Sequence, residues 1–135
     1  MINNMYQDIK STIKAIDNKE YSIEELVNGF IKKIETLDKF NLVSEKLYDD
    51  AILKAKKADA KKKEDRLPLE GIPVAVKDIF CTEGNKTSAS SNILENFKAP
   101  YESTVTQNLK DAGAIIICKT TMDEFAMGSA SDTCN

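Results

Sequence analysis

The stretch GIPVAVKDIF, residues 71–80, decides the fold, because it is a short apolar run with β-branched residues next to turn-forming ones. Its centre, Ile72–Val76, predicts a β-strand. Alternate residues of a strand share a face, so Val74 and Val76 point one way and Lys77 points the other way. The strand therefore ends in a lysine whose environment differs from that of the valines.

Two interpretations of Lys77 follow from the residue types alone. The first is a lysine at a strand end whose amine reaches water, which is common in a chain with 18 lysines. The second is a buried lysine whose pKa is lowered by desolvation, so that its neutral amine serves as a general base. A hydrolase without histidine could activate a serine in this way. The spacing of residues leaves both interpretations open.

The second half of the chain predicts a further strand and helix. Residues 114–118 form a continuous apolar run, which is typical of a strand buried on both faces. Residues 103–112 predict a helix that Ser103 caps and Gly113 ends, with Val105 and Leu109 on its buried side. Strand, helix and strand in this order predict an α/β fold, a sheet with helices packed on it.

The first half predicts three helices. The first covers Met5–Ile16, and the second begins at a capping box that Ser22 and Glu25 form. Hydrophobic residues then recur every three or four positions, which predicts one broad apolar face. A third helix is expected over Ser44–Lys63.

The composition changes near residue 67, where prolines, glycines and small hydroxyl residues become frequent. We therefore expect an N-terminal helical region over residues 1–66 and an α/β region over residues 67–135.

The overall composition excludes several classes of function. A net charge of −3 disfavours direct contact with nucleic acid, and no run of residues is apolar and long enough to cross a membrane. The N-terminus has no signal-peptide pattern, so we expect a cytoplasmic protein. Three distant cysteines indicate reduced thiols, and the absence of histidine excludes His-based catalysis and His-ligated zinc.

The end of the chain holds weaker candidates. Thr121 and Glu124 form a second capping-box pattern, which predicts a short helix through Phe125. The adjacent carboxylates of Asp123 and Glu124 are explained by helix capping rather than by acid–base catalysis. Turn or capping roles are also expected for the serines at positions 88, 90, 91, 129 and 131.

Four segments share a recognisable pattern: GIPVAVKD (71–78), TSAS (87–90), DAGA (111–114) and KTTMDEFAMG (119–128). Together they resemble the opening part of the amidase signature family, most closely the A-type subunits of bacterial glutamyl-tRNA(Gln) amidotransferases. The resemblance runs from Leu67 to Gly128, nearly half of the chain. A pattern of this length is far more specific than a short motif.

The resemblance implies a mixed β-sheet flanked by helices and a Ser–cis-Ser–Lys triad in which Lys77 is the lysine. It also implies that Met127 and Gly128 line the substrate pocket. In such a protein, glutamine is the substrate, and its side-chain amide is hydrolysed through an acyl-enzyme. The ammonia passes to a partner subunit that amidates glutamyl-tRNA, and the expected partners are the B- and C-type subunits. ATP and Mg²⁺ would be used by one of these partners, so no cofactor or metal is expected on this chain.

The sequence departs from the family pattern in two ways. The Gly/Ser-rich segment that supplies both catalytic serines does not occur within residues 1–135, so we expect this chain alone to be inactive. Ile79 also stands where the A-type subunits usually carry asparagine. Two alternatives therefore stay open: a shortened, non-catalytic relative that acts as an interaction module, and an amidase for another small amide.

Overall fold

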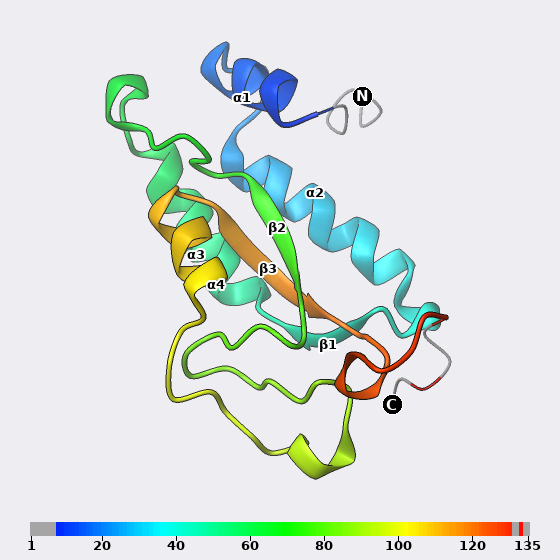
Figure 1. The fold of residues 1–135 in the computed structure, drawn as a ribbon. Coiled ribbons are helices and arrows are strands. Elements are labelled where there is room, and N and C mark those ends of the chain that lie inside the picture. Colours follow the sequence, from blue (N-terminus) through cyan, green and yellow to red (C-terminus); the bar gives the residue numbers. More distant parts are fainter. Residues whose placement is uncertain (1–7, 131–132, 134–135) are drawn as a thin grey trace.

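The computed structural model describes residues 8–130 and 133, and it shows a three-stranded mixed sheet with helices packed on it (Figure 1). The strands are β1 (Val43–Lys46), β2 (Pro73–Lys77) and β3 (Ile115–Thr120). Their order is β1-β3-β2; β3 pairs antiparallel with β1 and parallel with β2. This arrangement confirms the predicted fold class, in which helices precede a part of a mixed sheet.

Helices and short 3₁₀ turns connect the strands in the part of the chain that the structure describes. The α-helices are α1 (Ile9–Asp17), α2 (Ile23–Thr36), α3 (Tyr48–Asp59) and α4 (Thr104–Asp111). The 3₁₀ turns are Asp38–Phe40, Lys63–Asp65, Asn92–Leu94 and Glu124–Ala126. Residues 78–103, between β2 and α4, form a long loop that contains only one of these turns.

The hydrophobic core joins helices α2 and α3 to strand β3. Ile23, Leu26 and Val27 of α2 are fully buried, and they share one apolar cluster with Ala51 and Ala55 of α3. This cluster also contains three residues of β3, which are Ile115, Ile117 and Cys118. The two helices therefore cover one face of the sheet, and residues before and after position 66 build the same core.

The second helix begins as the sequence predicts. The Ser22 side chain accepts a hydrogen bond from the Glu25 amide, and the Glu25 carboxylate accepts one from the Ser22 amide. The two bonds satisfy backbone donors that have no partner inside the helix. The predicted capping box is confirmed.

Two predicted helices differ from those observed. Helix α1 begins at Ile9, after the cap residue Asp8, and the expected start at Met5 lies outside the described residues. The prediction of one helix over Ser44–Lys63 is wrong at both ends, because Val43–Lys46 pairs with β3 and α3 ends at Asp59. Pairing with a neighbouring strand overrides a helical pattern that local residues alone suggest.

Helix α4 follows its prediction in position but not in its buried face. Ser103 caps it by accepting a bond from the Thr106 amide, and Gly113 follows its end with φ of +91°. Val105, however, is 49% exposed, and Leu109 is half-buried, whereas Thr106 is fully buried. The prediction of Val105 as a buried residue is wrong, because the Thr106 hydroxyl bonds to backbone beneath the helix and sets the rotation of the helix.

The predicted capping box near the C-terminus does not form. The short turn Glu124–Ala126 begins after Asp123, whose side chain makes no capping bond. Phe125 has φ of +50°, in the left-handed region, so a regular helix cannot continue through it. No helix among the described residues is long and apolar enough to cross a membrane.

Candidate functional site

Lys77 is the last residue of β2, an edge strand of the described sheet. Ala75 and Lys77 are exposed and Val76 is buried, so the predicted alternation of faces is confirmed. Among the described residues the Lys77 side chain is exposed, and β2 is an edge strand of the sheet. Its role as the triad lysine stays a prediction.

Asp78, directly after Lys77, is fully buried. Its amide donates to the Thr120 carbonyl at 3.1 Å, and its own carbonyl accepts from the Ala89 amide at 3.3 Å. Its Oδ2 atom accepts from the Ser88 amide at 3.1 Å and from the Ser88 hydroxyl at 2.6 Å. Hydrogen bonds thus hold both the backbone and the side chain of Asp78, and they fix the start of the loop after β2.

Lys119 is the buried lysine of this site. Its side chain is 0% exposed, and its Nζ lies 2.9 Å from Asp78 Oδ1. It donates to the Lys86 carbonyl at 2.8 Å and to the Thr87 hydroxyl at 2.6 Å. The contact with Asp78 is close enough for an ion pair, but Oδ1 lacks the angular geometry of a hydrogen bond. Removing one member of such a pair leaves an uncompensated buried charge.

A β-bulge explains why Lys119 points to this site. Val74 pairs with Ile116 and Ala75 pairs with Cys118, so Ile117 is an extra residue in β3. Ile117 and Cys118 both join the core under α2 and α3. The next residue, Lys119, therefore points to the opposite face, whereas strict alternation after Ile117 would have turned it toward the helices.

The serines of residues 88–91 bond to other segments. The Ser90 hydroxyl accepts from the Met122 amide at 3.0 Å, and the Ser91 hydroxyl donates to Glu124 at 2.6 Å. Ser91 also caps the turn Asn92–Leu94, as expected of a capping residue. Ser88 bonds to the buried carboxylate described above, a role that the sequence did not indicate. Ser129 is exposed, and Ser131 lies outside the described residues.

Four non-glycine residues with left-handed backbone gather in this region. Ala89 and Ser90 have φ of +48° and +51°, and Phe125 and Ala126 have φ of +50° and +60°. The Phe125 amide donates to the Ala89 carbonyl at 3.1 Å and joins the two segments. Such conformations are costly for residues with a side chain, and they cluster at functional sites.

Met127 and Gly128, the residues implied to line the substrate pocket, are both exposed and follow the second of these segments. A Cβ atom on Gly128 would lie within 3 Å of the Asp123 side chain, so a larger residue there would require that side chain to shift. Their role in substrate binding stays a prediction.

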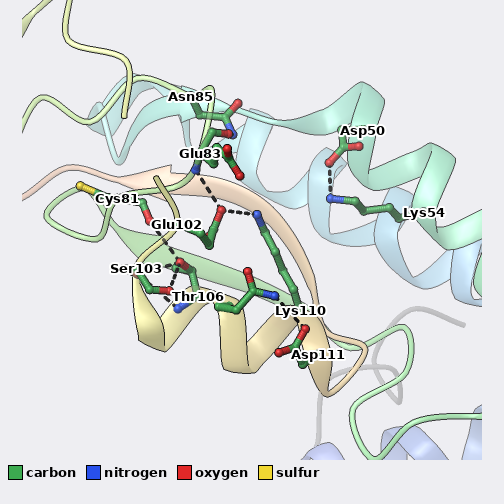
Figure 2. A network of polar contacts seen from close by, with 11 residues as sticks. Asp50, Lys54, Cys81, Glu83, Asn85, Glu102, Ser103, Thr106, Lys110 and Asp111 are labelled. Carbon is green, nitrogen blue, oxygen red and sulfur yellow. Dashed lines mark hydrogen bonds and ion pairs between the residues drawn. The ribbon is translucent and has the colours of Figure 1, made fainter. Parts of the chain in front are cut away.

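A second polar network holds the loop after β2 against α4 (Figure 2). The Glu102 carboxylate accepts from the Glu83 amide at 2.9 Å and from Lys110 at 2.6 Å. The Thr106 hydroxyl donates to the Cys81 carbonyl at 3.1 Å. Burial tends to raise the pKa of Glu102, but its hydrogen bonds, first of all that from Lys110, outweigh burial and lower the pKa.

The sequence identified Lys77 but missed the partnership of Asp78 with Lys119. Asp78 and Lys119 each follow an apolar run, and these two runs form parallel strands. The carboxyl ends of parallel strands meet at one edge of a sheet. The sequence therefore indicated that the two segments lie close together, but it did not show the bulge that turns Lys119 toward Asp78. Among the described residues, no group of three Cys, Asp or Glu residues could hold a metal ion.

Comparison with known proteins places these residues in a family. The profile of the Amidase family matches residues 25–134. The A subunit of the glutamyl-tRNA(Gln) amidotransferase of Rickettsia bellii (strain OSU 85-389) is 46% identical over 126 residues, which are 93% of this chain and 26% of that protein. Its counterpart in Pelagibacter ubique (strain HTCC1062) is 48% identical over 121 residues, 90% of this chain and 25% of that protein.

Solved structures agree with the sequence relatives. The native peptide amidase from Stenotrophomonas maltophilia has a TM-score of 0.83 at 26% identity and is matched over 98% of this chain and 28% of its own. The A subunit of the glutamyl-tRNA(Gln) amidotransferase from Thermotoga maritima has a TM-score of 0.70 at 27% identity, over 96% of this chain and 26% of its own. The chain spans about a quarter of the length of these relatives. Because the family profile matches most of its residues, the chain belongs to the amidase family.

Proposed function

We propose that this chain is the N-terminal part of a glutamine-hydrolysing amidase that releases ammonia for the amidation of glutamyl-tRNA(Gln). The identity of 46% and 48% to the A subunits of the Rickettsia bellii and Pelagibacter ubique amidotransferases supports this reaction. The observation that carries the proposal is the position of Lys77. This lysine is exposed at the carboxyl end of β2 and directly precedes Asp78, which is buried and hydrogen-bonded.

In the proposed reaction, the neutral Lys77 amine accepts a proton through a bridging serine from the nucleophilic serine. The serine oxygen then attacks the carboxamide carbon of glutamine, and the protonated lysine returns a proton to the departing nitrogen, which leaves as ammonia. Water hydrolyses the resulting acyl-enzyme. Both serines would come from a Gly/Ser-rich segment that residues 1–135 do not contain.

The partners in this proposal are B- and C-type amidotransferase subunits, in a cytoplasmic complex. ATP and Mg²⁺ would be used by one of these partners. The exposed side of β2 would be covered by the remaining part of the amidase, which would desolvate the Lys77 amine and favour its neutral form.

Ammonia release from glutamine tests the proposal. The 135-residue chain alone should release none, and a polypeptide that joins it to the serine-rich segment should release ammonia. In that polypeptide, Lys77→Ala should lower kcat by about 10²- to 10⁴-fold. Lys57→Ala, which removes an exposed lysine of α3, is the matched control and should leave the rate unchanged. Full activity of the Lys77→Ala variant would overturn the proposal.

A further inference from the structure

We propose that Asp78 and Lys119 are a positioning pair that fixes the direction in which Lys77 leaves β2. This role rests on the proposed function, because it gives the pair a purpose only if the Lys77 amine takes part in the reaction. The pair touches no open surface, since both side chains are 0% exposed.

The first argument is the contrast between neighbouring residues. Lys77 is exposed, and its amine makes no hydrogen bond or ion pair with the described residues, whereas Asp78 is bonded through its amide, its carbonyl and its carboxylate. Val76, on the other side, is buried and paired with Lys119 in the sheet. Consecutive Cα atoms are about 3.8 Å apart, so two fixed neighbours leave the Lys77 backbone little freedom.

The second argument is that Lys119 has no capacity left for chemistry of its own. Its amine donates hydrogen bonds to Lys86 and Thr87 and lies 2.9 Å from Asp78 Oδ1 in an ion pair, so oxygen atoms of the protein surround it. A substrate cannot reach a side chain with no exposed surface. Lys119 therefore acts through the segments it holds and not on a reacting atom.

The third argument is that the charged groups of Asp78 and Lys119 make hydrogen bonds of defined direction, which apolar side chains cannot make. An apolar pair of similar volume is often as stable as a buried ion pair, so stability alone does not explain these residues. The pair instead joins β2, β3 and residues 86–88 through bonds of defined geometry. An apolar pair would remove these side-chain bonds and leave residues 86–89 held by backbone bonds, such as that from the Thr87 amide to the Phe97 carbonyl.

NMR measurement of the backbone mobility of Lys77 in the 135-residue chain tests this positioning role. Lys119→Met should lower the ¹H–¹⁵N heteronuclear NOE of the Lys77 amide and speed hydrogen exchange of the Asp78 amide by about tenfold or more relative to that of Ile116. Lys61→Met is the matched control, because it breaks a partly buried ion pair, Glu70–Lys61, which lies before β2 and outside the loop that begins at Asp78. It should lower Tm and leave the Lys77 signal unchanged.

The double variant Asp78→Asn/Lys119→Met separates position from stability, because it leaves no buried charge of this pair uncompensated. We expect it to recover Tm and yet to keep Lys77 mobile. If Lys119→Met does not fold, the same NMR measurement is made on the double variant. A rigid Lys77 in the folded double variant would overturn the positioning role.

The enzyme that carries the serine-rich segment provides an independent measurement. There, the double variant should lower kcat with little change in KM, as expected when the base is misplaced. Because the NMR experiment needs no substrate, its failure rejects the positioning pair alone. Full activity of Lys77→Ala would reject the proposed function and leave the NMR result standing.

Discussion

The carboxylate of Asp59, the last residue of α3, accepts a hydrogen bond from the amide of Ile23, the first residue of α2, at 2.8 Å. Its second oxygen accepts from the Glu24 amide at 2.9 Å. One carboxylate thus ties the end of one helix to the beginning of another. Ser22 caps the same helix locally, so its start is held from two directions.

Replacing this cap should lower stability. Asp59→Ala removes two hydrogen bonds to partly buried amides, and we expect a loss of about 1–3 kcal/mol in the free energy of unfolding. Urea denaturation measures it. Glu64→Ala, at an exposed position, is the control and should stay within about 0.5 kcal/mol of the original chain. Equal stability of the two variants would contradict the cap.

The lowered pKa of Glu102 predicts a loss of stability in acid. A carboxyl group whose pKa is lower in the folded state than in the unfolded state stabilises the fold above its unfolded pKa of about 4.3. This contribution is lost as the pH falls from there through the lower, folded pKa. When the pH is lowered from about 7 to about 3, Tm should therefore decrease less for the Glu102→Gln variant than for the original chain. An identical pH profile in both chains would contradict this role.

The two described cysteines should differ in reactivity. Burial raises the pKa of Cys118 to about 11, and its thiolate fraction at pH 8 is therefore about one thousandth. Cys81 is partly exposed. Iodoacetamide labelling followed by peptide mass analysis should modify Cys81 in the native chain and Cys118 only after denaturation. Equal rates in the native chain would contradict the buried position of Cys118.

Two glycines offer a test of close packing. Gly113 and Gly84 both have positive φ, +91° and +77°. A Cβ atom at Gly113 would lie 2.9 Å from Glu70 Cα, whereas at Gly84 it would meet no atom within 4 Å. Gly84→Ala should therefore cost only the backbone strain, about 1–2 kcal/mol, and Gly113→Ala should cost more. Urea denaturation measures the loss in the free energy of unfolding for each variant. Equal losses would contradict a clash between a Cβ atom at position 113 and Glu70.

The sequence predicted the elements whose signals are local. The cap of α2, the strand before Lys77 and the buried run of β3 needed only side chains within a few residues of each other. Strand β1 was missed because its partner, β3, lies far later in the chain. The local sequence there resembles a helix, and pairing across that distance leaves no local trace.

The candidate site was predicted in part for the same reason. Lys77 stands out through a motif, but its exposure depends on which strands lie beside β2. Strict alternation along β3 from Ile115 would place Lys119 on the helix side, and the single extra residue at Ile117 that changes this count is not visible in a hydrophobic pattern. Sequence reasoning therefore found the residue to which the family resemblance assigns a role, and it missed the contacts that hold the neighbouring Asp78.

The bulge at Ile117 makes β3 one residue longer than its pairing with β2 requires. Removal of Ile117 would leave Ile116 opposite Val74 and Cys118 opposite Ala75, so the ladder would become regular and Lys119 would keep its side of the sheet. The surplus isoleucine fills space between β3 and the two helices above it. A shortened strand would thus keep the ion pair intact and leave a void beneath α2 and α3, which makes the extra residue a spacer for the interior rather than a part of the polar site.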